Sequence, residues 1–341
     1  MRTKLLVTTI LFGALAAALP ARAAGTLNLV CAADVKWCEL MEREFEASHD
    51  IDVNMVRMSS GEAYARLRAE ARNPKTDIWW AGTGDPHLQA ADDNLTLEYK
   101  SPMLDQLQPW AQKQAEVSGY KTVGVYSGAL GWGYNTQILE KKGLAAPACW
   151  KDLTDAKYKG EIQIANPNSS GTAYTALATL VQLMGEDEAF AYQKALNANI
   201  TQYTKSGSAP VKAAARGETG IGIVFMHDAV AMTKQGFPVK TVAPCEGTGF
   251  EVGSMSIVKG AKNLENAKVF YDWALSPEVQ SKAAEADSFQ LPSNKSATVP
   301  PEAPKLDDIK LIDYDFAKYG NAETRKALLE RWDREIGAAA N

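Results

Sequence analysis

Residues 166–175, NPNSSGTAYT, form a polar turn between two regular elements. The alternating stretch EIQIA before them predicts a β-strand, and ALATLVQLMG, which directly follows them, has the apolar spacing of a helix. Either Ser169 or Ser170 can cap that helix, Gly171 lets a ligand approach the backbone, and Thr172 lies in the first turn. A helix start presents unpaired N–H groups and a partial positive charge, so the turn predicts an anion site. For one such turn alone, an ordinary capped helix is the alternative.

The same arrangement recurs along the chain. Other strand-like stretches run into Ser59-Ser60-Gly61, Gly82-Thr83-Gly84, Ser206-Gly207-Ser208 and the pair His227-Asp228. Alternating strands and helices predict an α/β fold with mostly parallel sheets flanked by helices. Ligands of such folds bind beyond the carboxyl ends of the strands, which is where these polar turns fall.

The first residues predict export. Arg2 and Lys4 precede the apolar run LLVTTILFGALAAALP, and Ala21-Arg22-Ala23 fits a signal-peptidase site. Residues 1–23 are therefore expected to be a signal peptide cleaved near Ala23, which leaves 318 of the 341 residues in a bacterial periplasm.

Charge and length narrow the class of protein. Removal of the three positive charges of the signal peptide takes the formal net charge from −5 to −8, which argues against nucleic acid or an anionic membrane as partner. A chain of this length predicts two lobes. The glycine-broken stretch 122–135 is the expected first crossing between them. We expect lobe 1 to comprise residues 24–130 and about 255–300, lobe 2 to comprise 131–254 and about 301–341, and the protein to be a monomer.

Four cysteines in an exported chain predict disulfides, and four allow three connectivities. Cys31 and Cys38 lie seven residues apart across a strand-to-helix turn, whereas Cys149 and Cys245 both follow much later. The favoured pairing is 31 with 38 and 149 with 245. Three histidines and no C-x-x-C spacing argue against a zinc site.

Three longer stretches carry a family resemblance. They are GWGYN, WKDLTDAKYKGEIQIANPNSSGTAY, and AKVFYDWALSPEVQ followed by FQLPSN. With them the chain resembles the periplasmic substrate-binding proteins of ABC importers, in the branch that includes ferric-iron and phosphonate binders. The resemblance covers essentially the whole mature chain. It implies the two-lobed type II fold, a ligand cleft between the lobes, delivery to a membrane permease, and neither catalysis, nor a metal, nor a cofactor.

Ligand identity in this branch depends on a few positions. Ferric binders carry two adjacent tyrosines after the strand that reads GIGIVF here, whereas this chain has Met226, His227 and Asp228. The chain is more similar to the hexose-phosphate binders, in which serine and threonine turns hold the phosphate. The phosphate contacts implied by the resemblance are Ser59, Ser60, Thr83, Ser169, Ser170, Gly171, Thr172 and Ser208. The implied sugar contacts are His227, Asp228 and Glu251.

Each of these assignments has a structural alternative. His227 could be a satisfied core histidine, Asp228 the cap of the following helix, Glu251 a solvated hinge carboxylate, and Tyr174 a packing residue rather than a platform for a sugar ring. The ligand could instead be ferric ion, a phosphonate or another organophosphate. An exported hydrolase using Asp228 or Glu251 as a base is a further alternative, but the chain has no G-x-S-x-G, H-E-x-x-H or P-loop motif.

Overall fold

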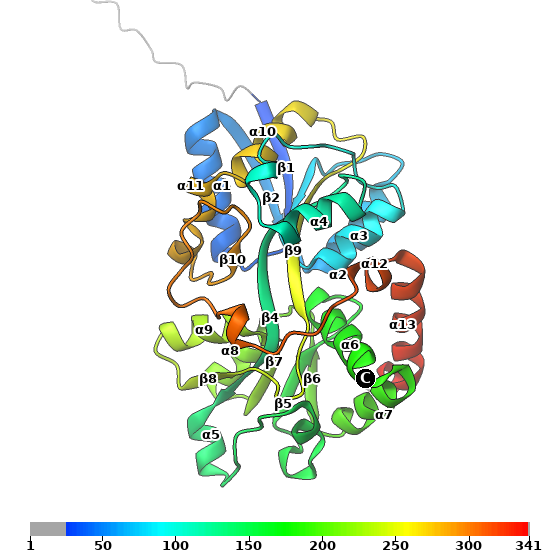
Figure 1. Ribbon diagram of the computed structural model, residues 1–341, viewed down its shortest axis with the longest axis vertical. Coiled ribbons are helices and arrows are strands. Elements are labelled where there is room, and N and C mark those ends of the chain that lie inside the picture. Colours follow the sequence, from blue (N-terminus) through cyan, green and yellow to red (C-terminus); the bar gives the residue numbers. More distant parts are fainter. Residues whose placement is uncertain (1–24, 340–341) are drawn as a thin grey trace, which may run out of the picture.

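Most strands of the chain run directly into a helix, as the polar turns predict. The computed structural model describes residues 25–339, so the predicted signal peptide lies outside the described residues. The elements up to the first long strand are β1 (Gly25–Cys31), α1 (Val35–His49), β2 (Ile51–Arg57), α2 (Ser60–Glu70), β3 (Ile78–Trp80), α3 (Gly84–Asp92) and α4 (Pro109–Val117). They lie together in the upper half of Figure 1.

The long strand β4 (Val123–Asn135) then carries the chain into the lower half (Figure 1). The elements there are α5 (Thr136–Lys141), β5 (Ile162–Ala165), α6 (Gly171–Met184), α7 (Glu186–Asn197), β6 (Ile200–Thr204), α8 (Ala209–Arg216), β7 (Ile221–Phe225), α9 (Met226–Lys234) and β8 (Val239–Val242). Strand β9 (Phe250–Ile257) returns to the upper half, where α10 (Leu264–Ala274), α11 (Pro277–Gln280) and β10 (Leu291–Pro292) follow. The chain ends on the lower half with α12 (Phe316–Tyr319) and α13 (Ala322–Glu335).

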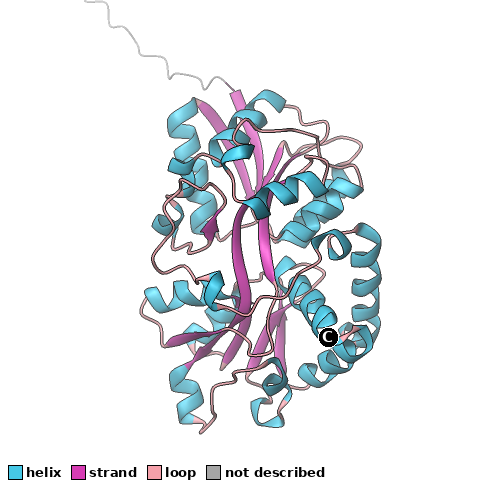
Figure 2. Ribbon diagram, in the orientation of Figure 1, coloured by secondary structure: helices cyan, strands magenta, loops and turns pink. Residues whose placement is uncertain are grey.

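The sheet is mixed rather than mostly parallel. Its main order is β2-β1-β3-β9-β4-β7-β5-β6, and β8 and β10 also pair with β4. The pairs β1–β2, β1–β3, β5–β6 and β5–β7 are parallel, as expected for strands joined through helices. Every pair made by β4 or β9 is antiparallel, because these two strands connect the halves in opposite directions (Figure 2).

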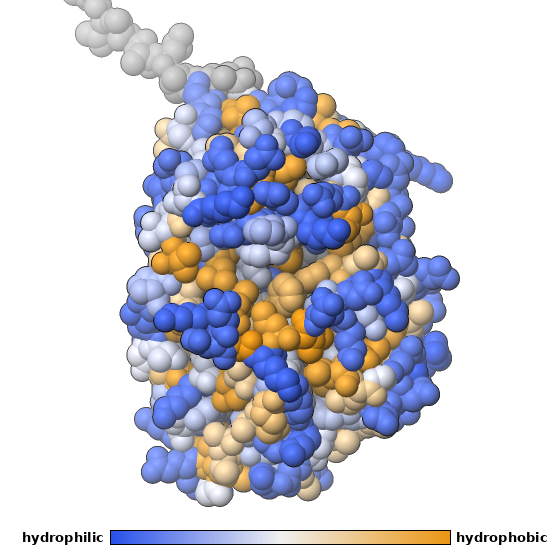
Figure 3. Space-filling model, in the orientation of Figure 1, coloured by the Kyte–Doolittle hydropathy of each residue, from blue (hydrophilic) through white to orange (hydrophobic). Residues whose placement is uncertain are grey.

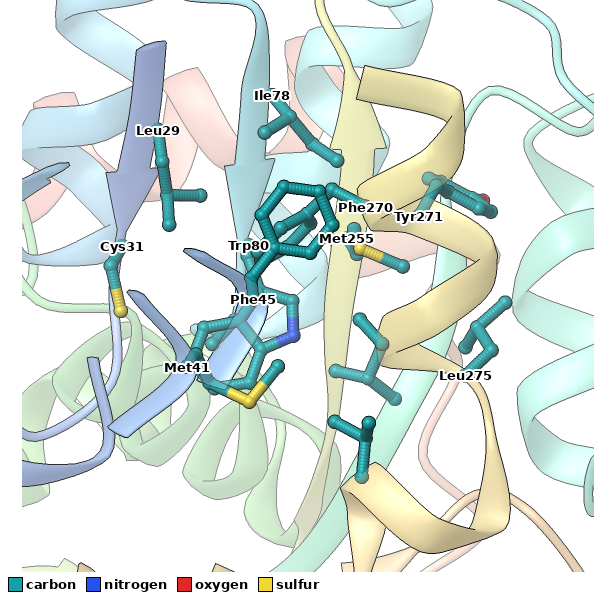
Figure 4. Packing of buried hydrophobic residues seen from close by; sticks show 14 of the residues in the cluster. Leu29, Cys31, Met41, Phe45, Ile78, Trp80, Met255, Phe270, Tyr271 and Leu275 are labelled. Carbon is teal, nitrogen blue, oxygen red and sulfur yellow. The ribbon is translucent and has the colours of Figure 1, made fainter. Parts of the chain in front are cut away.

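Each half has its own hydrophobic core. In the upper half, Phe45 packs edge-on against Phe270 of α10, and Trp80 of β3 lies in the same cluster (Figure 4). In the lower half, Trp132 and Trp150 meet with ring centroids 5.3 Å apart. Two cores joined by β4 and β9 are the arrangement that lets two lobes move relative to each other. The residue boundaries given above for the lobes remain a prediction.

The C-terminal segment spans both halves. Trp332 of α13 packs against Tyr203 of β6, which fixes the helix to the lower core. The same helix reaches the upper half, where Arg325 Nε donates to Gln89 Oε1 of α3 over 2.9 Å. The hydrophobic residues visible in Figure 3 gather at mid-height, while hydrophilic residues dominate the two ends of this face. Within residues 25–339 no helix has the length and apolar character needed to cross a membrane.

Two disulfides confirm the favoured pairing. Cys31 at the end of β1 is bonded to Cys38 in α1, and Cys149 is bonded to Cys245. The two cysteines of the first bond are 7 residues apart in the sequence, and those of the second are 96 residues apart. The short bond therefore fixes the turn at Asp34, and the long one fixes two distant segments of the lower half.

The long disulfide is expected to contribute more to stability. A Cys149→Ser/Cys245→Ser variant should lose about 4–5 kcal/mol of unfolding free energy, against about 2 kcal/mol for Cys31→Ser/Cys38→Ser, because the longer loop restricts the unfolded chain more. Urea unfolding of both variants at one pH measures the difference. A larger loss from the Cys31–Cys38 bond would contradict the loop-length argument.

Candidate functional site

Six helices begin around one cavity between the two halves. The residues at the N-cap positions of α1, α2, α3, α6, α8 and α9 are Asp34, Ser59, Thr83, Ser170, Ser208 and Phe225, respectively. All six line the same cavity, which has an empty volume of about 490 Å³. Because helix N-termini carry partial positive charge, their convergence favours an anionic ligand.

The structure brings together all but one of the residues predicted from the sequence. The cavity is lined by Ser59, Ser60, Thr83, Ser170, Gly171, Thr172, Ser208, His227, Asp228 and Glu251. Ser169 does not line it: its hydroxyl donates to the carbonyl oxygen of Lys205 over 3.1 Å. Ser170 is the residue that caps α6, since its hydroxyl accepts from the N–H of Ala173. Ser170, as the N-cap residue, therefore faces the cavity, whereas Ser169 lies outside it.

Hydroxyl groups and helix starts form one part of the cavity. Ser60 Oγ accepts from the backbone N–H of Thr83, which leaves the hydroxyl hydrogen of Ser60 free to donate elsewhere. Thr83 Oγ1 is buried and has no hydrogen-bond partner within residues 25–339. Gly171 faces Thr83 so closely that a Cβ on Gly171 would overlap Thr83 Oγ1. This part of the cavity therefore combines unused hydroxyl donors with the start of α6, as a phosphate site requires.

A histidine and two carboxyl groups form another part. His227 Nε2 lies 3.7 Å from Asp228 Oδ1 and 3.7 Å from Glu251 Oε1. His227 and Asp228 come from the first turn of α9, and Glu251 comes from the crossing strand β9. His227 Nδ1 packs against Gly128 and has no partner among the described residues. The three side chains offer several donor and acceptor positions to one bound molecule.

Burial shifts the pKa of each of these groups toward its neutral form. It lowers the pKa of His227 to about 4. Burial raises the pKa of Asp228 well above its usual range, and the negative charge of Asp34 adds to the shift. Burial likewise raises the pKa of Glu251, reinforced by Asp228. A buried carboxylate that accepts no hydrogen bond is unfavourable in free energy. A ligand whose hydroxyl groups donate to these carboxylates would therefore bind strongly.

The geometry decides several of the structural alternatives. His227 is not a satisfied core histidine, because Nδ1 lacks a partner in the described part of the chain. Glu251 is not a solvated hinge carboxylate, since only 3% of its surface is exposed. Tyr174 is a packing residue: it is fully buried in the lower core, and its hydroxyl donates to the carbonyl oxygen of Tyr319 over 2.6 Å. His227, Asp228 and Glu251 therefore line the cavity and remain candidates for sugar binding, whereas Tyr174 does not line it.

Four lining residues with polar side chains were not predicted from the sequence: Asp34, Arg57, Tyr126 and Gln290. Asp34 follows β1 and Arg57 ends β2, so both share the strand-end position of the predicted serines. That position was the available signal, although an aspartate before a helix is equally typical of an ordinary N-cap. Tyr126 lies on the crossing strand β4 and its hydroxyl accepts from the N–H of Gly82. Gln290 immediately precedes β10, within the FQLPSN stretch that carried the family resemblance, but it follows no strand end that would mark it as a site residue.

Direct contacts between the halves enclose the cavity. The N–H of Gly61 in α2 donates to the carbonyl oxygen of Ser169 over 3.0 Å. Ser59 Oγ donates to the carbonyl oxygen of Lys205 over 3.1 Å. Because each bond joins an upper-half turn to a lower-half turn, the structure represents a closed arrangement of the two lobes.

The residues around the cavity do not resemble a metal centre. Across the described residues, the grouping with metal-ligand spacing is Cys149, Cys245 and Glu246, and its two cysteines are joined in a disulfide. A ferric site would need several phenolate or carboxylate oxygens around one point. One tyrosine, Tyr126, lines the cavity, and burial raises its pKa well above the usual value, which disfavours the phenolate.

Known proteins share this sequence and fold. A family model of bacterial extracellular solute-binding proteins matches residues 41–310. An uncharacterized protein of Haemophilus influenzae is 46% identical over 334 residues, which cover 97% of this chain and 96% of that protein. The periplasmic binding protein AfuA of Actinobacillus pleuropneumoniae, solved with exogenous fructose-6-phosphate bound, is 49% identical with a TM-score of 0.90, covering 92% of this chain and 99% of that one. The periplasmic binding protein P5PA is 38% identical with a TM-score of 0.89 and the same coverage.

The family match spans most of the chain, and the two solved structures extend the similarity over nearly all of the described residues. The two-lobed α/β fold expected from the sequence is therefore confirmed, as is the resemblance on which that expectation rested. The family is one of solute-binding proteins, and both solved relatives are periplasmic binding proteins. The protein belongs to the family of bacterial extracellular solute-binding proteins.

Proposed function

We propose that the protein binds a phosphorylated sugar, a hexose phosphate such as glucose-6-phosphate, and delivers it to an ABC importer. The observation that carries this proposal is the composition of one enclosed cavity. Hydroxyls and helix starts at Ser60, Thr83 and Ser170 suit a phosphate, while His227, Asp228 and Glu251 suit sugar hydroxyls. The bound fructose-6-phosphate in the similar protein AfuA supports the same ligand class.

The energetics are adequate for micromolar binding. Hydrogen bonds to charged groups contribute roughly 1.5–3 kcal/mol each. Six such bonds give about 9–18 kcal/mol, against an association cost of about 4–15 kcal/mol. Micromolar affinity corresponds to about −8 kcal/mol, which is within this surplus.

Other ligands fit one part of the cavity and leave another unused. A phosphonate or inorganic phosphate would engage the hydroxyl groups but leave His227, Asp228 and Glu251 without donors. Ferric ion would need phenolate oxygens, for which Tyr126 is the single candidate among the lining residues. We propose that the protein does not hydrolyse its ligand, because the carboxyl groups are arranged with a neutral imidazole to hold hydroxyls.

A thermal-shift screen tests the proposal. The panel comprises glucose-6-phosphate, fructose-6-phosphate, glucose, inorganic phosphate, 2-aminoethylphosphonate and ferric citrate. A ligand present at 100 times its Kd should stabilise the fold by about 2.7 kcal/mol. The expected result is a shift with hexose phosphates and none with glucose or phosphate. Release of free phosphate from a bound hexose phosphate would favour the hydrolase, and a response to iron or phosphonate alone would reject the proposed ligand.

Affinity for a hexose phosphate is expected to fall as pH falls from 7 to 5. The second phosphate pKa is about 6, so roughly a tenth of the ligand remains dianionic at pH 5, which predicts about a tenfold loss. His227 does not oppose this trend, because burial lowers its pKa to about 4 and it stays neutral over the range. Calorimetric titrations at pH 5, 6 and 7 measure the effect. Tighter binding at pH 5 would mean that His227 becomes charged.

The proposed partners follow from the family role. We propose that the protein is exported to the periplasm, where its signal peptide is cleaved near Ala23. There it acts as a monomer that delivers its ligand to an inner-membrane permease. N-terminal sequencing of the exported protein tests the cleavage site. Light scattering of the purified protein tests the oligomeric state, with and without ligand.

A further inference from the structure

An ion pair joins the two lobes at the edge of the cavity. Asp34 ends the turn after β1, and Lys212 lies in α8 on the opposite lobe. Lys212 Nζ lies 2.7 Å from Asp34 Oδ1, and Ser208 Oγ donates to the same oxygen over 2.9 Å. Asp34 makes no side-chain cap bond to its own helix. Its carboxylate therefore bridges the lobes instead of stabilising α1.

The pair stands between two hollows. Asp34 lines the ligand cavity, and both Asp34 and Lys212 line a separate outer groove with an empty volume of about 680 Å³. The groove also contains Val35 and Phe237, whose surfaces are 49% and 37% exposed. Asp34 borders both spaces and Lys212 borders the outer groove, so the ion pair forms part of the wall that separates them.

The charge of the pair is maintained in the closed state. Burial alone would raise the pKa of Asp34, but the ammonium of Lys212 and the hydrogen bonds from Lys212 and Ser208 outweigh it and hold the pKa below its usual value. Arg57 adds a further positive charge: its Nη2 donates to Ser206 Oγ across the same boundary over 3.2 Å. Side chains that remain about one-third exposed stay within reach of salt and solvent.

We infer that the Asp34–Lys212 pair is a gate between the ligand cavity and the outer groove, and that it limits the ligand to the size of a monosaccharide phosphate. The inference rests on the proposed function for the identity of the ligand. Opening the lobes must break this pair, so it slows ligand release. Shortening Lys212 frees Asp34 from its position in the wall, which joins the two hollows and admits a larger phosphorylated ligand.

Three variants of Lys212 separate the roles of charge and length. Lys212→Met keeps most of the length and removes the charge, and is expected to speed dissociation of glucose-6-phosphate by about three- to tenfold. The dissociation rate of the wild type should rise with added salt, and that of Lys212→Met should not, because the screened pair is absent. Lys212→Arg should retain the slow rate. Lys212→Ala should in addition bind a disaccharide phosphate, trehalose-6-phosphate, that the wild type rejects.

A matched control is available within the upper half. Lys282 pairs with Glu44 over 2.5 Å, and the side-chain exposures of 37% and 30% nearly equal the 36% and 30% of Lys212 and Asp34. Lys282→Met should leave dissociation rate, salt dependence and ligand size unchanged. Equal dissociation rates for Lys212→Met and Lys282→Met, or continued rejection of the disaccharide phosphate by Lys212→Ala, would overturn the gate.

Failure of the gate differs from failure of the proposed function. If the wild type binds no hexose phosphate, the proposed function fails, and the same rates are measured with the panel compound that does bind. A faster rate for Lys212→Met alone would then still support the gate, whereas equal rates would reject it.

Discussion

A Gly61→Ala protein is expected to bind its ligand about fivefold to a hundredfold more weakly than the wild type, without loss of thermal stability. Gly61 lies in the first turn of α2 and does not line the ligand cavity. A Cβ at this position would overlap the carbonyl oxygen of Asn168 and lie 2.8 Å from that of Ser169, both on the opposite lobe. The substitution therefore obstructs closure while leaving every ligand contact in place.

Stability is expected to stay level or rise, because alanine favours a helix by about 0.8–1 kcal/mol over glycine when the site is unstrained. In the open state the added methyl group faces solvent, so only the closed state is penalised. Calorimetric titration gives the affinity, thermal unfolding gives the stability, and solution scattering with ligand reports closure. Ala65→Ser, at an exposed position one turn further along α2, is the matched control. Wild-type affinity and full compaction in Gly61→Ala would mean that closure does not require this contact.

The second large effect is expected at Asp228. Asp228→Ala should weaken hexose-phosphate binding by about 1.5–3 kcal/mol, the loss expected for one charge-assisted hydrogen bond. The side chain is 13% exposed and lies beside His227, so no water-filled space replaces the missing acceptor easily. Because the change affects the sugar-binding groups, discrimination between glucose-6-phosphate and other hexose phosphates should also diminish.

Two comparisons make the Asp228 result interpretable. Asp228→Asn keeps the shape but replaces one acceptor oxygen by a donor, so it should lose affinity to a similar extent. Asp52→Ala removes an exposed carboxylate of β2 outside the cavity and should bind as the wild type does. Titration of all three with glucose-6-phosphate measures the effect. An unchanged affinity in Asp228→Ala would remove Asp228 from the ligand site.

The polar turns were predictable because their chemistry is local. A strand followed by Ser59-Ser60-Gly61 or Ser170-Gly171-Thr172 encodes a helix start, and the carboxyl ends of strands in an α/β fold share one edge. The sugar-binding candidates depended on the family resemblance. His227 and Asp228 follow β7 as expected, and Glu251 lies on β9, the strand that returns to the upper half.

What the sequence did not reveal depends on how the lobes meet. Asp34 resembles a helix cap until Lys212 and Ser208 are seen opposite it. Ser169 and Ser170 are chemically identical neighbours, and only the helix geometry decides which one faces the cavity. The antiparallel pairing of β4 with β9 follows from their shared role as crossings, which local periodicity does not report.

The most direct test of the central claim is calorimetric titration of the mature wild-type protein with glucose-6-phosphate, glucose and inorganic phosphate at pH 7. We expect one site per chain with micromolar or tighter affinity for glucose-6-phosphate. Neither glucose alone nor inorganic phosphate alone should bind measurably. Saturable binding of inorganic phosphate with the same affinity as glucose-6-phosphate, or no response to any hexose phosphate, would contradict a cavity in which His227, Asp228 and Glu251 bind a sugar.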